Sequence, residues 1–162
     1  MIWWHEAQFA LWNRSNLLDR TLGWYEKAEP IARQIAQRQG FDGVRWMKKT
    51  DPSGTEAPSK VGSFLIWQQP HLIYLAELLY RADPTKEVLE KYNRLVQETA
   101  EFMYSFATYD ELEGRYVLKG AIPALETLRA ADTVYPPFEL SYGLFAMQTD
   151  QQCRERMGQL RS

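Results

Sequence analysis

Two neighbouring segments between residues 119 and 142 carry the side chains whose types favour chemistry. The first segment, residues 119–126, has one acidic residue, Glu126. The aromatic residues Tyr135, Phe138 and Tyr142 follow it. A carboxyl group can donate a proton near neutral pH when burial against apolar walls raises its pKa. Loops on a rigid frame often carry catalytic residues. We therefore take Glu126 as the first candidate for a general acid, against the alternative of a solvated loop glutamate.

The composition fits a single globular domain over residues 1–162 and argues against several classes of partner. The chain is 45% apolar and 14% aromatic, which supplies a sizeable core. Its 19 Lys and Arg residues nearly balance 21 Asp and Glu residues. The chain therefore has no excess of positive charge that would favour binding to the phosphates of a nucleic acid. No apolar run reaches the roughly 18 residues of a membrane span. We expect neither nucleic acid nor a membrane as a partner.

The start of the chain and its few cysteine and histidine residues narrow the expectations further. Residues 1–6 lack the basic start and apolar middle of a signal peptide, so localisation stays open. Cys153 is the one cysteine and cannot form an internal disulfide. The two histidines have no cysteine partners at zinc-ligand spacing. We expect no metal and no cofactor.

The apolar periodicity predicts a mostly helical chain. Helices are expected over residues 4–12, 16–39, 71–81, from Asp83-Pro84 to 107, and from 137 onward. Pro30 predicts a kink or a restart in the second of these, and therefore two helical segments. Residues 41–69 predict a long loop and residues 115–118 a short strand. The fold class is therefore all-α, built from antiparallel helical hairpins.

Four motifs in chain order resemble the catalytic barrel of six-hairpin glycosidases, the (α/α)6 toroid, and in particular its glycoside hydrolase family 65-like group. Residues 4–11 resemble the family's Trp-Asp-x-Glu-x-Phe-x-Leu segment, although His5 and Ala7 replace its acidic residues. Residues 43–46 and 54–56 resemble its Gly-Ala-Arg-Phe and Gly-x-Glu loops. Residues 71–77 resemble a histidine-led helix start, and residues 120–126 its Gly-Pro-Asp-Glu loop.

The resemblance implies an enzyme that cleaves a glycosidic bond of a small carbohydrate, by attack of water or phosphate. It gives Glu126 the role of general acid, which protonates the departing oxygen. It also implies a sugar-sized cleft. The residues expected to line it are Trp4, His5, Arg45, Trp46, Glu56, Lys60 and Tyr142.

The resemblance also implies that this chain is about half of a toroid. Uncovered apolar helix faces usually find a partner, so we expect a homo-oligomer. An inverting hydrolase needs a second carboxylate about 6.5–9.5 Å from the acid. In related hydrolases that base comes from a later hairpin, so it is missing here or supplied by another copy. Glu6, Asp51 and Glu56 are the substitutes within the chain.

Gly143 and Cys153 stand on the last predicted helix, where relatives would carry bulky aromatic residues. Gly143 indicates either a close helix crossing or a cavity opened by the missing side chain. Cys153 is either a small buried hydrophobe or a nucleophile. His71 is expected to be structural. Two alternatives to the glycosidase therefore remain, a non-catalytic helical binding or scaffold module and a small hydrolase of activated esters with a pocket opened at Gly143.

Overall fold

The computed structural model describes residues 2–123 and 129–159 and confirms a mostly helical, all-α fold. Its helices are α1 (Ile2–Leu11), α2 (Ser15–Arg38), α3 (His71–Ala82), α4 (Lys86–Phe106) and α5 (Pro137–Arg156). Two short 3-10 helices, η1 (Gly62–Phe64) and η2 (Ala130–Asp132), lie in the connections. The strands β1 (Thr108–Asp110) and β2 (Arg115–Val117) pair antiparallel, so the predicted strand is confirmed within a hairpin.

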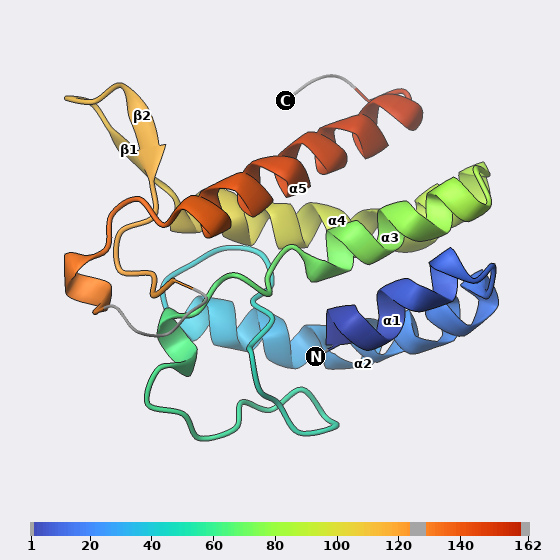
Figure 1. The fold of residues 1–162 in the computed structure, drawn as a ribbon, viewed down its shortest axis with the longest axis horizontal. Coiled ribbons are helices and arrows are strands. Elements are labelled where there is room, and N and C mark those ends of the chain that lie inside the picture. The colour runs from blue at the N-terminus through green and yellow to red at the C-terminus, as the bar shows by residue number, and fades with distance from the viewer. Residues whose placement is uncertain (1, 124–128, 160–162) are drawn as a thin grey trace.

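The helices form two layers of opposite direction. α1, α3 and α5 run the same way, and their N-terminal ends lie on the same side of the molecule (Figure 1). α2 and α4 return in the opposite direction behind them, as expected for antiparallel hairpins. The helices of each layer pack on each other and on the other layer. This arrangement does not test closure into a six-hairpin toroid, which stays a prediction.

The prediction of two helices around Pro30 is wrong, because α2 runs unbroken from Ser15 to Arg38. Proline removes one backbone hydrogen bond and usually kinks a helix. Here the buried residues Leu22 and Tyr25 before Pro30, and Ala32 and Ile35 after it, continue one face of the helix. Pro30 itself lies on the exposed side. Burial of that common face keeps the two halves together as one helix.

The predicted start of α4 is displaced by two to three residues. The cap is Thr85, whose hydroxyl oxygen accepts a hydrogen bond from the amide of Val88 at 3.4 Å. The helix therefore begins at Lys86 and not at Asp83-Pro84. A threonine in extended conformation is a favourable cap, and it lies closer to the apolar stripe than Asp83 does.

The long connection between α2 and α3 is tied into the core by two glutamines that precede α3. The side chain of Gln69 accepts a hydrogen bond from the amide of Trp46 at 2.8 Å and donates one to the carbonyl of Val44 at 2.5 Å. Gln68 donates to the carbonyl of Trp46 at 2.9 Å. Gly43 at the start of this segment has φ +67°, and a Cβ there would collide with the carbonyl oxygen of Glu98.

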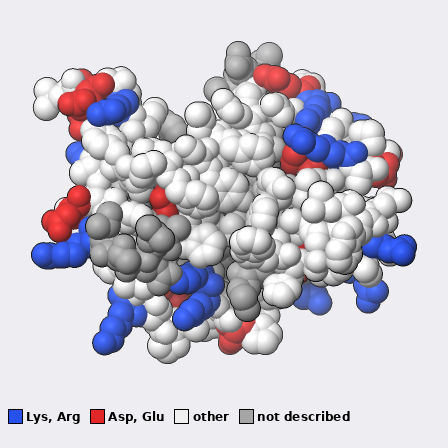
Figure 2. All heavy atoms as spheres, viewed as in Figure 1, with Lys and Arg blue, Asp and Glu red and all other residues white. Residues whose placement is uncertain are grey.

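The apolar core lies between the two helical layers and includes Leu18, Leu22, Leu72, Leu75 and Leu95. Figure 2 shows the charged side chains mainly toward the edges of the viewed face, with a largely uncharged centre. In the part of the chain that the structure describes, no helix combines the length and apolarity that a membrane crossing requires.

Candidate functional site

An aromatic cleft of about 500 Å³ lies where the N-terminal ends of α1, α3 and α5 meet. The described residues that line it are Trp3, Trp4, Trp67, His71, Phe138, Ser141, Tyr142 and Phe145. Volumes of about 300–1,000 Å³ are typical of small-molecule sites. The cleft therefore has the size and the aromatic walls of a ligand site, with few polar groups to fix a ligand's orientation.

His71 and Tyr142 supply the polar pair of the aromatic cleft. A hydrogen bond joins His71 Nδ1 to the Tyr142 hydroxyl at 3.0 Å. Burial lowers the pKa of His71 to about 4, so its ring is neutral at pH 7. Burial also raises the pKa of Tyr142, whose hydroxyl therefore keeps its proton. Within the described residues His71 Nε2 forms no hydrogen bond, so its hydrogen-bonding capacity is unused there.

The sequence around α5 explains how one helix serves this cleft and a second cavity. Phe138, Ser141, Tyr142 and Phe145 stand at i, i+3, i+4 and i+7 and form the stripe that faces the aromatic cleft. Leu140, Gly143, Leu144 and Met147 repeat the same spacing two residues later and face the second cavity. A shift of two residues turns the helix by about 200°, so the two stripes lie on nearly opposite faces and α5 stands between the cavities.

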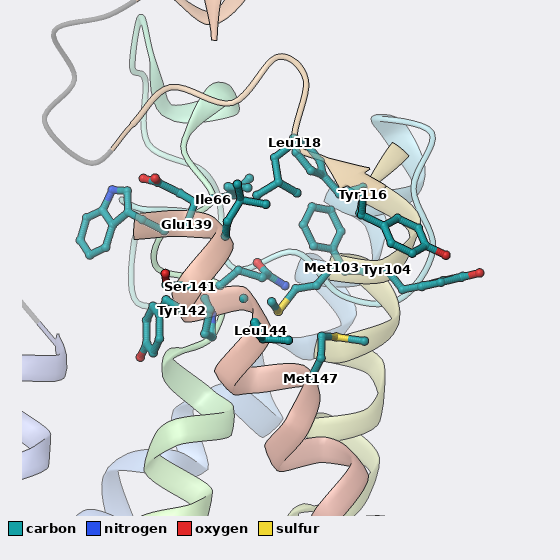
Figure 3. A pocket seen from close by; sticks show the side chains of 18 of the residues that line it. Ile66, Met103, Tyr104, Tyr116, Leu118, Glu139, Ser141, Tyr142, Leu144 and Met147 are labelled. Carbon is teal, nitrogen blue, oxygen red and sulfur yellow. The ribbon is translucent and has the colours of Figure 1, made fainter. Parts of the chain in front are cut away.

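The second cavity, here called the Gly143 cavity, measures about 640 Å³. Met103, Leu144 and Met147 lie on one side of it, and Tyr116 of β2 and Leu118, which follows β2, lie on the other (Figure 3). Trp67, Ser141 and Tyr142 line both cavities, which are therefore neighbours with a common wall.

Gly143 does not mark a close helix crossing. Among the described atoms outside its own helix, a Cβ at this position would meet Met103 Cε at 3.4 Å and nothing else within 4 Å. That is ordinary contact with the end of a flexible side chain. A glycine inside a helix costs about 1 kcal/mol relative to alanine, and backbone packing does not require it here. The interpretation that favours an opened cavity fits this geometry.

Glu139 is a buried carboxylate beside the Gly143 cavity that the sequence analysis missed. It is 3% exposed, and neither carboxylate oxygen has a hydrogen-bond partner among the described residues. Figure 3 places it with Ile66 at the end of the cavity opposite Tyr104 and Tyr116. Both oxygens are enclosed by protein. An acidic residue in the first turn of a helix is favourable whether it is exposed or buried, so the position of Glu139 in the sequence gives no signal of burial.

Glu126, the predicted general acid, lies outside the described residues. Of the other predicted site residues, Trp4 and Tyr142 line the aromatic cleft together. His5 is exposed on α1 and lines neither cavity. The structure adds Trp67 and His71 to the cleft, and His71 is the residue that the sequence had assigned a structural role.

Arg45 and Trp46 are buried in the core and line neither cavity, contrary to the expectation that they face a sugar. Arg45 donates to Gln39 Oε1 at 2.5 Å and to the Ser63 carbonyl at 2.7 Å. Burial lowers the pKa of Arg45 to about 10, which still leaves it charged at neutral pH. The indole of Trp46 donates to Thr99 Oγ1 at 2.9 Å. These bonds fix the long connection, and neither side chain is among the residues that line the two cavities.

Glu56 and Lys60 lie on the long connection and line neither cavity. Glu56 forms an ion pair with Arg38 at 2.8 Å, and Lys60 is exposed. The other two carboxylates considered as bases, Glu6 and Asp51, also line neither cavity. Among the described residues that line either cavity, Glu139 is therefore the one carboxylate.

Cys153 is buried near the C-terminal end of α5, away from the lining of both cavities. Burial raises the pKa of its thiol to about 11, so the thiolate is scarce at neutral pH. This environment fits the small buried hydrophobe and gives no support to a nucleophile. In the described ranges no three His, Cys, Asp or Glu side chains gather in a way that could hold a metal ion.

Comparison of the chain with protein-family models gives no match, and a search of curated proteins likewise returns no similar sequence.

Proposed function

We propose that this chain binds a carbohydrate in the aromatic cleft and contributes to cleavage of a glycosidic bond. The observation that supports the proposal is the combination of Trp4, Trp67 and Phe138 with the His71–Tyr142 pair in one cleft. Aromatic faces match the apolar faces of sugar rings. The paired hydroxyl and imidazole offer a donor and an acceptor to sugar hydroxyl groups.

The proposed chemistry uses Glu126 as the general acid. It protonates the glycosidic oxygen as the bond from that oxygen to the anomeric carbon breaks, while an oxygen of water or phosphate bonds to the same carbon. The attacking water gives its proton to a base, which in inverting enzymes is a carboxylate about 6.5–9.5 Å from the acid. Glu139 is the one carboxylate among the described lining residues, and its oxygens are enclosed.

That enclosure favours a second candidate function, carbohydrate binding without turnover. It also supports the proposal that another copy supplies the base. Large apolar side chains are exposed on α1 and directly after it, including Trp4 at 77%, Leu11 at 80% and Trp12 at 70%. Surfaces of this kind often mark interaction sites. We therefore propose a homo-oligomer, for which light scattering at micromolar concentration should give at least twice the mass of the chain; a monodisperse monomer would exclude it.

Trp4 and Trp12 offer a matched pair of variants for the binding test. Both are exposed tryptophans near α1, but only Trp4 lines the aromatic cleft. Titration calorimetry with a panel of mono- and disaccharides should show binding by the unmodified chain. Trp4→Ala should weaken it about tenfold, corresponding to about 1.4 kcal/mol, whereas Trp12→Ala should leave it unchanged. Equal effects of the two variants would contradict a sugar site in this cleft.

Turnover is tested separately with nitrophenyl glycosides. Loss of a general acid should reduce the rate of Glu126→Gln by roughly 10²–10⁴-fold. Saccharide binding without turnover would favour the binding module. If Glu126→Gln hydrolyses the glycosides at the same rate as the unmodified chain, Glu126 is excluded as the general acid.

A further inference from the structure

We propose that the Gly143 cavity is a subsite for an aromatic group joined to the sugar, so that the ligands of this chain are aryl glycosides. This inference rests on the proposed function because the aromatic cleft must hold the sugar. It adds the chemical class of the group at the other end of the glycosidic bond.

The lining of the Gly143 cavity suits an apolar ring. Phe102, Phe106, Leu140, Leu144 and Leu118 contribute ring and aliphatic surface. Met103 and Met147 add two thioethers, which make favourable contacts with aromatic rings and adapt to the shape of a ligand.

The polar groups of this cavity are largely engaged within the protein. The Gln69 amide bonds to the backbone of Trp46 and Val44. The Tyr142 hydroxyl is bonded to His71, and the oxygens of Glu139 are enclosed. A ligand rich in hydroxyl groups would lose more hydrogen bonds to water than the few remaining polar groups of the lining could replace. The cavity therefore favours an apolar group over a second sugar ring.

Gly143 provides the room for that group. It stands in the middle of the stripe formed by Leu140, Leu144 and Met147, where a side chain would point into the cavity. The described atoms leave open space beyond Met103 Cε. The cavity is therefore controlled by the size of the residue at position 143.

The shared wall supports the assignment of both cavities to one ligand. Trp67, Ser141 and Tyr142 line the aromatic cleft and the Gly143 cavity alike. The two α5 stripes differ by two residues, which is about 200° around the helix, so the cavities adjoin at these shared residues near the first turns of α5. A sugar bound against Tyr142 in the cleft thus lies beside the cavity that would receive its aromatic substituent.

The test compares 4-nitrophenyl and methyl glycosides of the same sugars by titration calorimetry, together with free 4-nitrophenol. Burial of an apolar ring should make the unmodified chain bind the 4-nitrophenyl compound about tenfold more tightly, or better, than the methyl compound. Gly143→Phe should fill the cavity and remove both this preference and the binding of 4-nitrophenol. Gly143→Ala is the matched control, because its methyl group leaves most of the cavity open and should retain both.

The outcomes separate this inference from the proposed function. Equal affinities of the unmodified chain for methyl and 4-nitrophenyl glycosides would overturn the aryl subsite while leaving the sugar site intact. A preference that persists in Gly143→Phe would also overturn it. If no methyl glycoside binds, the proposed function fails, and free 4-nitrophenol still tests whether the cavity takes a ring. If thermal melting shows that Gly143→Phe does not fold, the smaller Gly143→Leu takes its place.

Discussion

The buried imidazole of His71 should make the stability of the protein depend on pH in a predictable direction. Its pKa is about 4 in the folded protein, against an ordinary value of 6.5. Between these values the unfolded chain binds a proton that the folded protein does not, so the free energy of unfolding falls as the pH falls. Each whole step in pKa is worth about 1.36 kcal/mol, which predicts a total loss of about 3 kcal/mol, most of it by about pH 4.5.

Urea unfolding of the unmodified chain and of His71→Gln at about pH 7 and pH 4.5 measures this contribution as the difference between the two pH dependences. The variant should lose about 2 kcal/mol less than the unmodified chain over this range. Carboxylates titrate in the same range, but they do so in both proteins and cancel in the difference. His5→Gln is the control, since His5 is exposed. Parallel pH dependences of the unmodified chain and His71→Gln would refute the burial argument.

Three further predictions concern stability and reactivity. Glu77 accepts hydrogen bonds from two arginines and is 3% exposed, so Glu77→Gln should lower the free energy of unfolding in urea by about 3 kcal/mol. Glu90→Gln, in a surface ion pair, should lower it by less than about 0.5 kcal/mol. Similar losses in the two variants would contradict this prediction. Gly43→Ala should cost more than about 2 kcal/mol because its methyl group meets backbone, whereas Gly40→Ala, with positive φ in open space, should cost about 1 kcal/mol. Iodoacetamide should modify Cys153 at neutral pH only as the protein unfolds; rapid modification of the folded protein would show an accessible thiol.

Much of the fold could be predicted from the sequence because each helix repeats an apolar stripe. α4 shows this most clearly, with a stripe from Leu89 to Phe102 that its buried residues reproduce. The break at Pro30 was predicted wrongly because a local rule ignores burial on both sides of the proline. In α2 and in α4, burial of one apolar face determines where the helix continues.

The site was harder to predict, because it is assembled from residues far apart in the chain. Trp4, His71 and Tyr142 meet only when three helix starts lie on one side of the fold. Nothing in the local motif around Arg45 and Trp46 indicates that it turns toward the core and away from the cleft. Motifs indicate which residues are close in sequence, and tertiary packing decides which cavity they face.

The glutamine bonds between the long connection and the start of α3 have a consequence for dynamics. Gln68 and Gln69 hold the backbone of Val44 and Trp46, and they directly precede the first turn of α3 that carries His71. The connection therefore cannot swing away as a lid without disturbing the cleft. Its Trp46 amide should exchange with deuterated solvent as slowly as helical amides of the core, so a segment without regular secondary structure would belong to the most stable cooperative unit of the protein.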